Sequence, residues 1–201
     1  MRKNIIFLML FGFSALLLST DARATSEDSV ENKHARTVNQ QALDTMMTTL
    51  RACVAPELSN RIQNVRLHID SNHDVFAYSS SGRIVISQGL LLNFRDKDFL
   101  HFILAHELSH HMLSHLERSQ RMMPGEIFEE TVAASLKQYF EFELEADLMA
   151  TQILRRCSID ISRIGEHLEQ LIASTRESAE IPSLLQFHQR RIGKLKALPA
   201  N

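Results

Sequence analysis

The sequence has no excess of basic residues and very few cysteines. Lysine and arginine together number 22, against 24 aspartates and glutamates, and the formal net charge is −2 at pH 7. This balance predicts neither nucleic acid nor an anionic membrane surface as a partner. Only two cysteines are present, Cys53 and Cys157, and neither has the histidine or cysteine neighbours of a zinc site. No repeat or low-complexity tract occurs, so the length of 201 residues predicts one domain with its own core.

A long apolar run lies at the N-terminus, over residues 5–18, and two basic residues precede it. Ala22-Arg23-Ala24 follows it as a cleavage site of the small-x-small type. This order predicts a secretory signal peptide over residues 1–24 and a mature domain over residues 25–201. Because the run is short for a membrane span, we expect no stable membrane insertion after cleavage, with an uncleaved N-terminal anchor as the alternative.

Export would place the cysteines in a compartment that permits disulfides. Cys53 and Cys157 are therefore a candidate disulfide, which would close a loop of about 100 residues. Two buried free thiols are the alternative interpretation.

The stretch from Leu100 to His115 carries the arrangement His106-Glu107-x-x-His110. Apolar residues recur around it at three- and four-residue steps as far as Leu116, which predicts a helix with Asp96 as its N-cap. On a helix, residues i and i+4 lie about 5–6 Å apart, so both imidazoles can converge on one zinc ion. Glu107 turns about 100° from them and can act as a general base on a water at that ion. A core helix with surface histidines is the alternative.

A catalytic zinc site needs one more protein ligand, and an acidic helix predicted over residues 126–156 offers it. Glu143 and Asp147 stand at i and i+4 on one face of that helix. The first can ligate zinc, while the second can accept a hydrogen bond from a ligating imidazole and fix its orientation. Glu141 and Glu145 point elsewhere, turned by about 160–200° from this face.

The rest of the sequence predicts an α+β domain that is mainly helical. Three short strands should form a small, mainly antiparallel sheet, and further helices should flank it. The polar segment 119–125 is expected to break the helix that carries the histidines and to form a mobile cover near the site, with an exposed turn remote from the metal as the alternative. The strands are expected over residues 65–70, 75–78 and 83–87, and the additional helices over residues 35–53, 160–174 and 182–198.

These motifs together resemble the HtpX-like zinc metallopeptidases related to the CAAX prenyl protease, a group of gluzincins. The resemblance rests on His106-Glu107-Leu108-Ser109-His110, on Glu143-x-x-Ala146-Asp147 and on the stretch from Gly82 to Leu91, and it covers roughly residues 38–198. It implies a minimal gluzincin metallopeptidase domain with an active-site helix, in a periplasmic short form without tetratricopeptide repeats. It also implies one Zn²⁺ per chain with His106, His110 and Glu143 as ligands, Glu107 as the catalytic base and Asp147 as the partner of a ligand.

The resemblance implies roles outside the two motifs as well. The family's Asn-Ala-Phe edge strand corresponds to Asp74-Val75-Phe76, so Val75, Phe76 and Ala77 are the expected substrate-binding residues. The aspartate departs from the family pattern. Near the C-terminus the family has a His-Pro and an Arg-Ile, and this chain has His188 and Arg191 without the proline. His188 and Arg191 are therefore candidates for the catalytic site, with a structural histidine and an exposed helix charge as the alternatives.

Other histidines accompany the motif. His111 and His115 also stand four residues apart, but Met112 occupies the place of the base and their face is rotated by about 100° from that of the motif. Solvated or capping roles are therefore expected for both. His101 and His167 are expected to be structural or to lie on the surface.

These observations predict an exported, periplasmic zinc metalloendopeptidase whose substrates are polypeptides bound as extended segments at a sheet edge. By resemblance its substrates would be misfolded or misassembled envelope proteins. The alternative is a non-catalytic zinc-containing chaperone or assembly factor of the envelope. Glu107 favours the enzyme, because a structural zinc site fills all four positions and has no use for a base.

Overall fold

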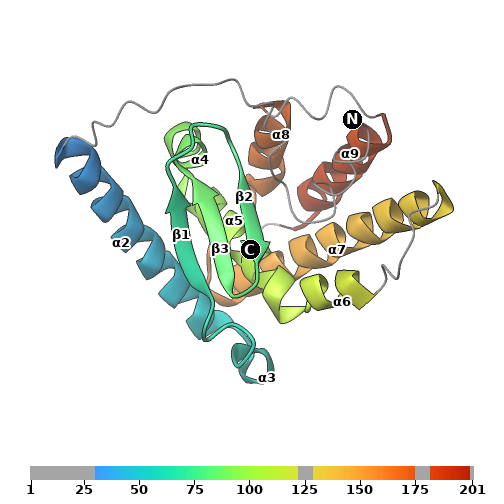
Figure 1. Ribbon diagram of the computed structural model, residues 1–201, viewed down its shortest axis with the longest axis horizontal. Coiled ribbons are helices and arrows are strands. Elements are labelled where there is room, and N and C mark those ends of the chain that lie inside the picture. Colours follow the sequence, from blue (N-terminus) through green and yellow to red (C-terminus); the bar gives the residue numbers. More distant parts are fainter. Residues whose placement is uncertain (1–29, 122–128, 175–181, 200–201) are drawn as a thin grey trace.

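A long helix, a small sheet and a set of helices follow one another along the chain (Figure 1). The computed structural model describes residues 30–121, 129–174 and 182–199, and the predicted signal peptide lies outside them. The strands are β1 (Arg66–Asp70), β2 (Ala77–Ser80) and β3 (Arg83–Ser87). The helices are α2 (Val30–Cys53), α3 (Pro56–Ser59), α4 (Gln88–Asn93), α5 (Lys97–Met112), α6 (His115–Arg121), α7 (Glu129–Arg156), α8 (Ile164–Ser174) and α9 (Pro182–Lys196). The predicted mainly helical α+β class is confirmed.

Helix α5 lies at the centre of the molecule, between the sheet and α7 (Figure 1). Asp96 caps its N-terminus, because its carboxylate accepts hydrogen bonds from the backbone N–H groups of Asp98 and Phe99. This predicted cap is confirmed. Apolar residues surround the helix axis, and Phe99, Phe102, Leu104 and Leu108 are almost fully buried. A helix that is apolar all round is buried on all sides, and here it carries the histidine motif into the core.

The sheet is mixed rather than mainly antiparallel, with the strand order β1-β3-β2. β3 pairs antiparallel with β2 and parallel with β1. The segment after Asp70 carries the chain to the far edge, and the hairpin then returns β3 to the centre. Gly82 in this hairpin has φ +69, a left-handed conformation that glycine adopts without a Cβ clash. The continuous apolar run Ile84-Val85-Ile86 is typical of a central strand buried on both faces, and it could have indicated this order.

The active-site helix ends at Met112, one turn earlier than the predicted end at Leu116. Ser114 has a left-handed φ of 54°, which ends α5 and turns the chain into α6. Arg61 holds this bend, because its Nη1 donates to the carbonyl oxygen of Met112 at 2.6 Å and lies 3.3 Å from Ser114 Oγ. The predicted break over 119–125 is wrong for its first residues, since α6 continues to Arg121. Residues 122–125 lie outside the described part of the chain.

Cys53 and Cys157 form a disulfide, with their Cα atoms 5.5 Å apart. Cys53 is the last residue of α2, and Cys157 directly follows α7. The bridge therefore ties the C-terminal ends of the two longest described helices to each other, and both cysteines pack against the hydrophobic core. In the described residues, no helix has both the length and the apolar character needed to cross a membrane.

Candidate active site

His106 and His110 project from adjacent turns of α5 toward α7. Their Nε2 atoms lie 3.1 Å apart, as the i,i+4 spacing of the two residues allows. The rings meet edge to face with centroids 4.8 Å apart. The buried N-terminal half of α5 and its Asp96 cap fix the helix axis, so the positions of both imidazoles are set by the core rather than by a loop.

Glu143 on α7 completes a triangle with the two histidines. Its Oε2 lies 3.4 Å from His106 Nε2, and its Oε1 lies 3.4 Å from His110 Nε2. Tetrahedral coordination with bonds of about 2.0–2.1 Å separates neighbouring ligand atoms by about 3.3 Å, so the triangle has the size that zinc requires. Ala146 and Ala150 are fully buried on α7, and their small side chains allow the two helices to approach closely enough for Glu143 to reach the histidines.

The donor set of this triangle also fits zinc. Two imidazole nitrogens and one carboxylate oxygen are a common ligand set of catalytic zinc sites, and they leave one position open. Among the described residues, these are the side chains that bring three such ligand atoms within 4.8 Å of one another. Glu143 Oε2 is buried and makes no hydrogen bond of good geometry, although Arg191 Nη1 lies 3.0 Å from it.

Asp147 lies one turn beyond Glu143 and supports His106 from behind. Its Oδ1 is 2.9 Å from His106 Nδ1, so Nε2 of the same ring points into the triangle. Arg191 on α9 donates to both carboxylate oxygens of Asp147, from Nε and Nη2, at 2.8 Å each. Its Nη1 lies 3.0 Å from Glu143 Oε2. With 2 % of its surface exposed, Arg191 is a buried bridge between both carboxylates and not an exposed helix charge.

His188 lies on α9 three residues before Arg191 and is buried as well. Burial and the neighbouring charge of Arg191 lower the pKa of His188 to about 4, so its ring is neutral at pH 7. It is not among the residues that line the cavity at the histidine triangle, whereas Arg191 is. The structure thus brings Arg191 to the site and leaves His188 behind it.

His115 is buried beside the site, so the predicted solvated or capping role is wrong for it. Its Nδ1 lies 2.9 Å from His110 Nδ1, and its Nε2 lies 3.1 Å from Glu145 Oε2. The ring stacks on Phe142 with centroids 4.3 Å apart. The prediction failed because it continued α5 through His115, whereas the left-handed Ser114 turns this side chain back toward His110. The i,i+5 pairing of His110 and His115 across a helix end has no simple periodic signal in the sequence.

The neighbouring histidines remain outside the triangle. His111 Nε2 lies 3.2 Å from the carbonyl oxygen of Arg83, at the rim of the cavity. His167 Nε2 lies 3.2 Å from Asp96 Oδ2, which links α8 to the N-cap of α5. His101 Nδ1 lies 2.8 Å from the carbonyl oxygen of Lys97 on its own helix.

Glu107 lies on the cavity side of α5 and contacts the sheet. Ser79 Oγ on β2 is 2.6 Å from Glu107 Oε2 and 2.8 Å from the carbonyl oxygen of the same residue. Burial raises the pKa of Glu107, and the charge on His106 and the hydroxyl of Ser79 oppose that shift. The carboxyl group is thus held in one orientation beside the triangle with an increased affinity for a proton. Sequence reasoning did not find Ser79, because a serine in a short strand carries no signal of its own.

Electrostatics at the triangle favour a bound cation. Burial alone would lower the pKa of His106, but Asp147 and Glu143 outweigh it and raise the pKa to about 10. Burial, only partly offset by Glu143, lowers the pKa of His110 to about 3. Burial alone would raise the pKa of Glu143, but Arg191 and the two histidines hold it below its usual value. Without a metal, the site therefore carries a proton on His106 between two carboxylates, at the place where a metal cation would neutralise them.

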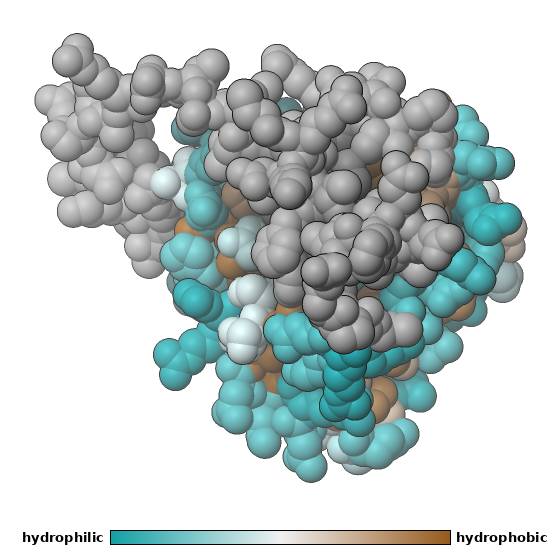
Figure 2. Space-filling model, turned by 45° about the vertical axis from the view of Figure 1, so that its right-hand side comes forward, coloured by the Kyte–Doolittle hydropathy of each residue, from teal (hydrophilic) through white to brown (hydrophobic). Residues whose placement is uncertain are grey.

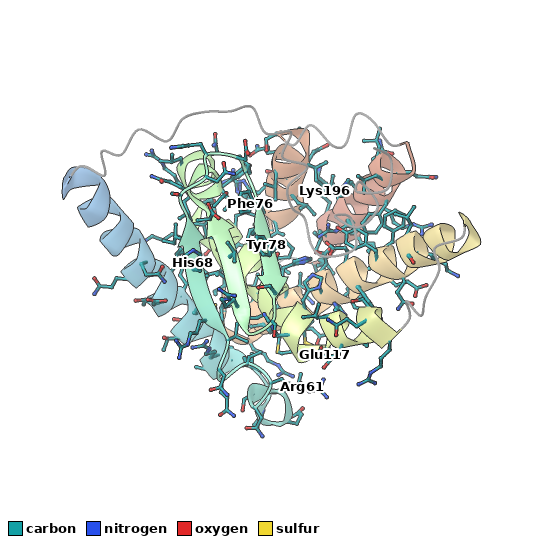
Figure 3. The ribbon with its side chains drawn as sticks, viewed as in Figure 1. Arg61, His68, Phe76, Tyr78, Glu117 and Lys196 are labelled. Atoms are coloured by element: carbon teal, nitrogen blue, oxygen red, sulfur yellow. A yellow bond between two sulfur atoms is a disulfide. The ribbon has the colours of Figure 1, made fainter. Side chains whose placement is uncertain are left out.

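A cavity opens in front of the triangle, between β2 and α6. Phe76 lines it on the strand side and Glu117 on the helix side (Figure 3). Val75 and Ala77 line it as well, so the predicted substrate-binding residues do lie at the site. In the described part of the chain, β2 pairs only with β3, which leaves its outer edge without a partner strand. A peptide can add to such an edge through backbone hydrogen bonds.

Gly89 fixes the segment that leads into this edge strand. A Cβ atom at this position would lie 2.1 Å from the carbonyl oxygen of His73 and 2.4 Å from that of Asp74. Only glycine allows this approach, in which the N–H of Gly89 also donates to the carbonyl oxygen of Asn72. The Asp74 N–H donates to Asn72 Oδ1 at 2.8 Å, so the side chain of Asn72 binds the backbone just before the edge strand.

The geometry agrees with a comparison against known protein families. The model of peptidase family M48 matches residues 39–166, which is more than half of the chain. The matched region contains the α5 motif, Glu143 and Asp147, and it ends before α9 and Arg191. A search of curated proteins found no significant match.

Proposed function

The chain belongs to peptidase family M48, whose members are zinc-dependent peptidases, and we propose that it is an exported endopeptidase that cleaves polypeptides in the periplasm. The single observation that carries the proposal is the position of Glu107, buried beside the His106–His110–Glu143 triangle and hydrogen-bonded to Ser79. A zinc site that serves only the fold is closed by four protein ligands. Here three ligands and an adjacent base fit a hydrolytic site.

The proposed chemistry assigns a role to each side chain. His106, His110 and Glu143 would hold one Zn²⁺, which when bound polarises the substrate carbonyl and acidifies water. Glu107 takes the proton from the attacking water and then passes it to the departing amine. Its raised pKa suits both steps, because a group that accepts and donates within one turnover works best near the ambient pH. Ser79 steadies the carboxyl group as it changes its protonation state.

Arg191 would keep the carboxylates of Glu143 and Asp147 ionised. Burial alone would lower its pKa, but Asp147 and Glu143 outweigh burial and raise it, so the guanidinium stays charged at all working pH values. Its bidentate contact holds Asp147 against His106. Arg191 thus orients a ligand, and it also lines the cavity at the triangle.

The substrate is proposed to be an extended segment of an unfolded or misassembled envelope protein. Strand β2 and the residues before it, Val75 and Phe76, would pair with it through backbone groups, which demands little of its sequence. The cavity lining next to Glu107 is rich in apolar side chains, and unfolded proteins expose such side chains. Where Figure 2 shows coloured residues, they are mostly hydrophilic, with small separate hydrophobic patches between them.

The test compares Glu107→Gln with the wild-type protein in zinc content and in hydrolysis of casein and of a short peptide. Glutamine keeps the shape of the side chain but cannot take a proton, so activity should fall by about 10²–10⁴-fold while zinc remains bound. Glu141→Gln, which changes an exposed carboxylate of α7, is the matched control and should behave as wild type. A chelator should abolish wild-type activity.

The ligand assignment is tested in the same assay. Glu143→Ala should lose both zinc and activity, while Glu107→Gln loses activity alone. Full activity of Glu107→Gln would refute the proposed chemistry. Stoichiometric zinc in Glu143→Ala, with loss of zinc in Glu145→Ala, would show that the other glutamate is the ligand.

A further inference from the structure

The two candidate histidine ligands are supported from behind in different ways. His106 Nδ1 faces the carboxylate of Asp147, which is paired with Arg191. His110 Nδ1 faces a second imidazole, that of His115, at 2.9 Å. His115 in turn faces the carboxylate of Glu145, which Arg118 binds through Nη1 at 2.7 Å and Nη2 at 3.3 Å. Behind each ligand, the chain of contacts ends at a carboxylate–arginine pair. The chain behind His110 contains one additional imidazole, that of His115.

The chemistry of ligation sets the direction of each hydrogen bond in this link. A histidine that binds a metal through Nε2 in its neutral form carries its proton on Nδ1. His110 must then donate from Nδ1, and His115 must accept with Nδ1. The proton of His115 is thereby on Nε2, which is the atom that faces Glu145 Oε2. Every donor in the chain from His110 to Glu145 thus meets an acceptor.

We propose that His115 is a positioning residue for the metal site, which fixes the ring orientation and the tautomer of His110 and is itself held by Glu145 and Arg118. This inference rests on the proposed zinc site, because it gives His110 the role of a ligand. Such outer partners raise the basicity of a ligating histidine, and their removal typically weakens metal binding by about 10–100-fold.

The surroundings of His115 hold its ring in one plane. Phe142 stacks against it with an angle of 10° between the planes, and the guanidinium of Arg118 lies 4.4 Å from the centroid of the Phe142 ring. His115 has 3 % of its surface exposed, whereas the side chains of Arg118 and Glu145 are 38 % and 41 % exposed. An ion pair as exposed as Arg118–Glu145 contributes little to folding stability, so its loss should be measurable at the metal without unfolding the protein.

The experiment measures the zinc dissociation constant by competition with a chromophoric chelator and records the visible absorption of the Co²⁺-substituted protein. In His115→Phe the ring still fills the space on Phe142 but accepts no hydrogen bond, and zinc binding should weaken by about 10–100-fold. In His115→Asn the Oδ1 atom takes the place of Nδ1 and can still accept from His110. This variant should recover most of the affinity and the wild-type Co²⁺ spectrum. His101→Phe, on the opposite side of the motif in α5, is the control and should bind zinc as wild type does.

Glu145→Ala tests the outer end of the link, with Glu141→Ala as its matched control on the same helix. Zinc affinity should fall several-fold in the first and stay unchanged in the second. The inference is overturned if His115→Phe and Glu145→Ala both bind zinc as tightly as wild type, or if His115→Asn is as impaired as His115→Phe, since packing alone would then explain the position. Zinc affinity is measured without substrate, so a protein that binds zinc as expected but cleaves nothing would refute the proposed function and leave this inference standing.

Discussion

Raising the pH should destabilise the metal-free protein through His106. Asp147 and Glu143 raise its pKa in the folded protein to about 10, although burial alone would lower it. In the unfolded chain a histidine titrates near 6.5. Since the folded value is the higher one, the folded state holds one more proton between these two values. The stabilisation is complete below pH 6.5 and is lost as the pH rises toward 10.

The magnitude follows from the gap between the two pKa values. Inside the window, the free energy of unfolding should fall by about 1.4 kcal/mol for each pH unit, to a total of about 5 kcal/mol. His106 has 7 % of its surface exposed, so solvent screens the interaction little. The lowered pKa values of His110, at about 3, and of Glu143 lie below the window, so neither group offsets the change. Zinc needs neutral His106 and releases its proton, so zinc affinity should rise about tenfold per pH unit over the same range.

Urea unfolding at pH 7, 8 and 9 measures this slope in chelator-treated protein and in zinc-saturated protein. The zinc-saturated protein should become more stable relative to the metal-free protein as the pH rises. Asp147→Asn removes the carboxylate that faces His106 Nδ1 and should flatten the slope of the metal-free protein. Equal stability of the metal-free wild type at pH 7 and pH 9, or the same slope in Asp147→Asn, would show that His106 does not hold the proton.

Two further predictions concern the scaffold of the site. Replacing Cys53 and Cys157 by alanine should lower the free energy of unfolding by up to about 4.7 kcal/mol, because the bridge closes a loop whose ends are 104 residues apart. Thiol labelling of the denatured, non-reduced wild type should find no free cysteine, and two labelled thiols would contradict the bridge. Asp96→Ala should cost about 1 kcal/mol in urea unfolding, because two N–H groups of α5 lose their acceptor; an unchanged midpoint would mean that the cap adds nothing to the core packing.

The sequence contained most of the metal site because its signals are local. His106 and His110 are one helical turn apart, and so are Glu143 and Asp147, so each pair could be placed on one face from spacing alone. Asp96 could be read as a cap because the helix begins directly after it. The meeting of the two helices is a long-range event, but the ligand number of zinc required a partner for the histidine pair, and that requirement pointed to α7.

The missed features depend on the tertiary structure or on a single backbone angle. The order of the strands is decided by where the chain crosses after Asp70, and the apolar run of β3 was the one local hint of it. His115 reaches His110 only because Ser114 adopts a left-handed conformation, which is uncommon for a serine. Arg191 could be proposed only by resemblance, and its contact with Asp147 spans 44 positions of the sequence.

Because of the disulfide, a molecule with one cut peptide bond can be mistaken for an intact one. The segment between Cys53 and Cys157 contains β1 to β3, α5 and all of α7, so one hydrolysed bond anywhere between the cysteines leaves both fragments attached to each other. A protein that cleaves polypeptides meets its own copies at high concentration during purification. A single band in a non-reducing gel would thus count nicked and continuous chains alike, and only the reduced sample separates them. Specific activities should therefore be normalised to the band that remains after reduction.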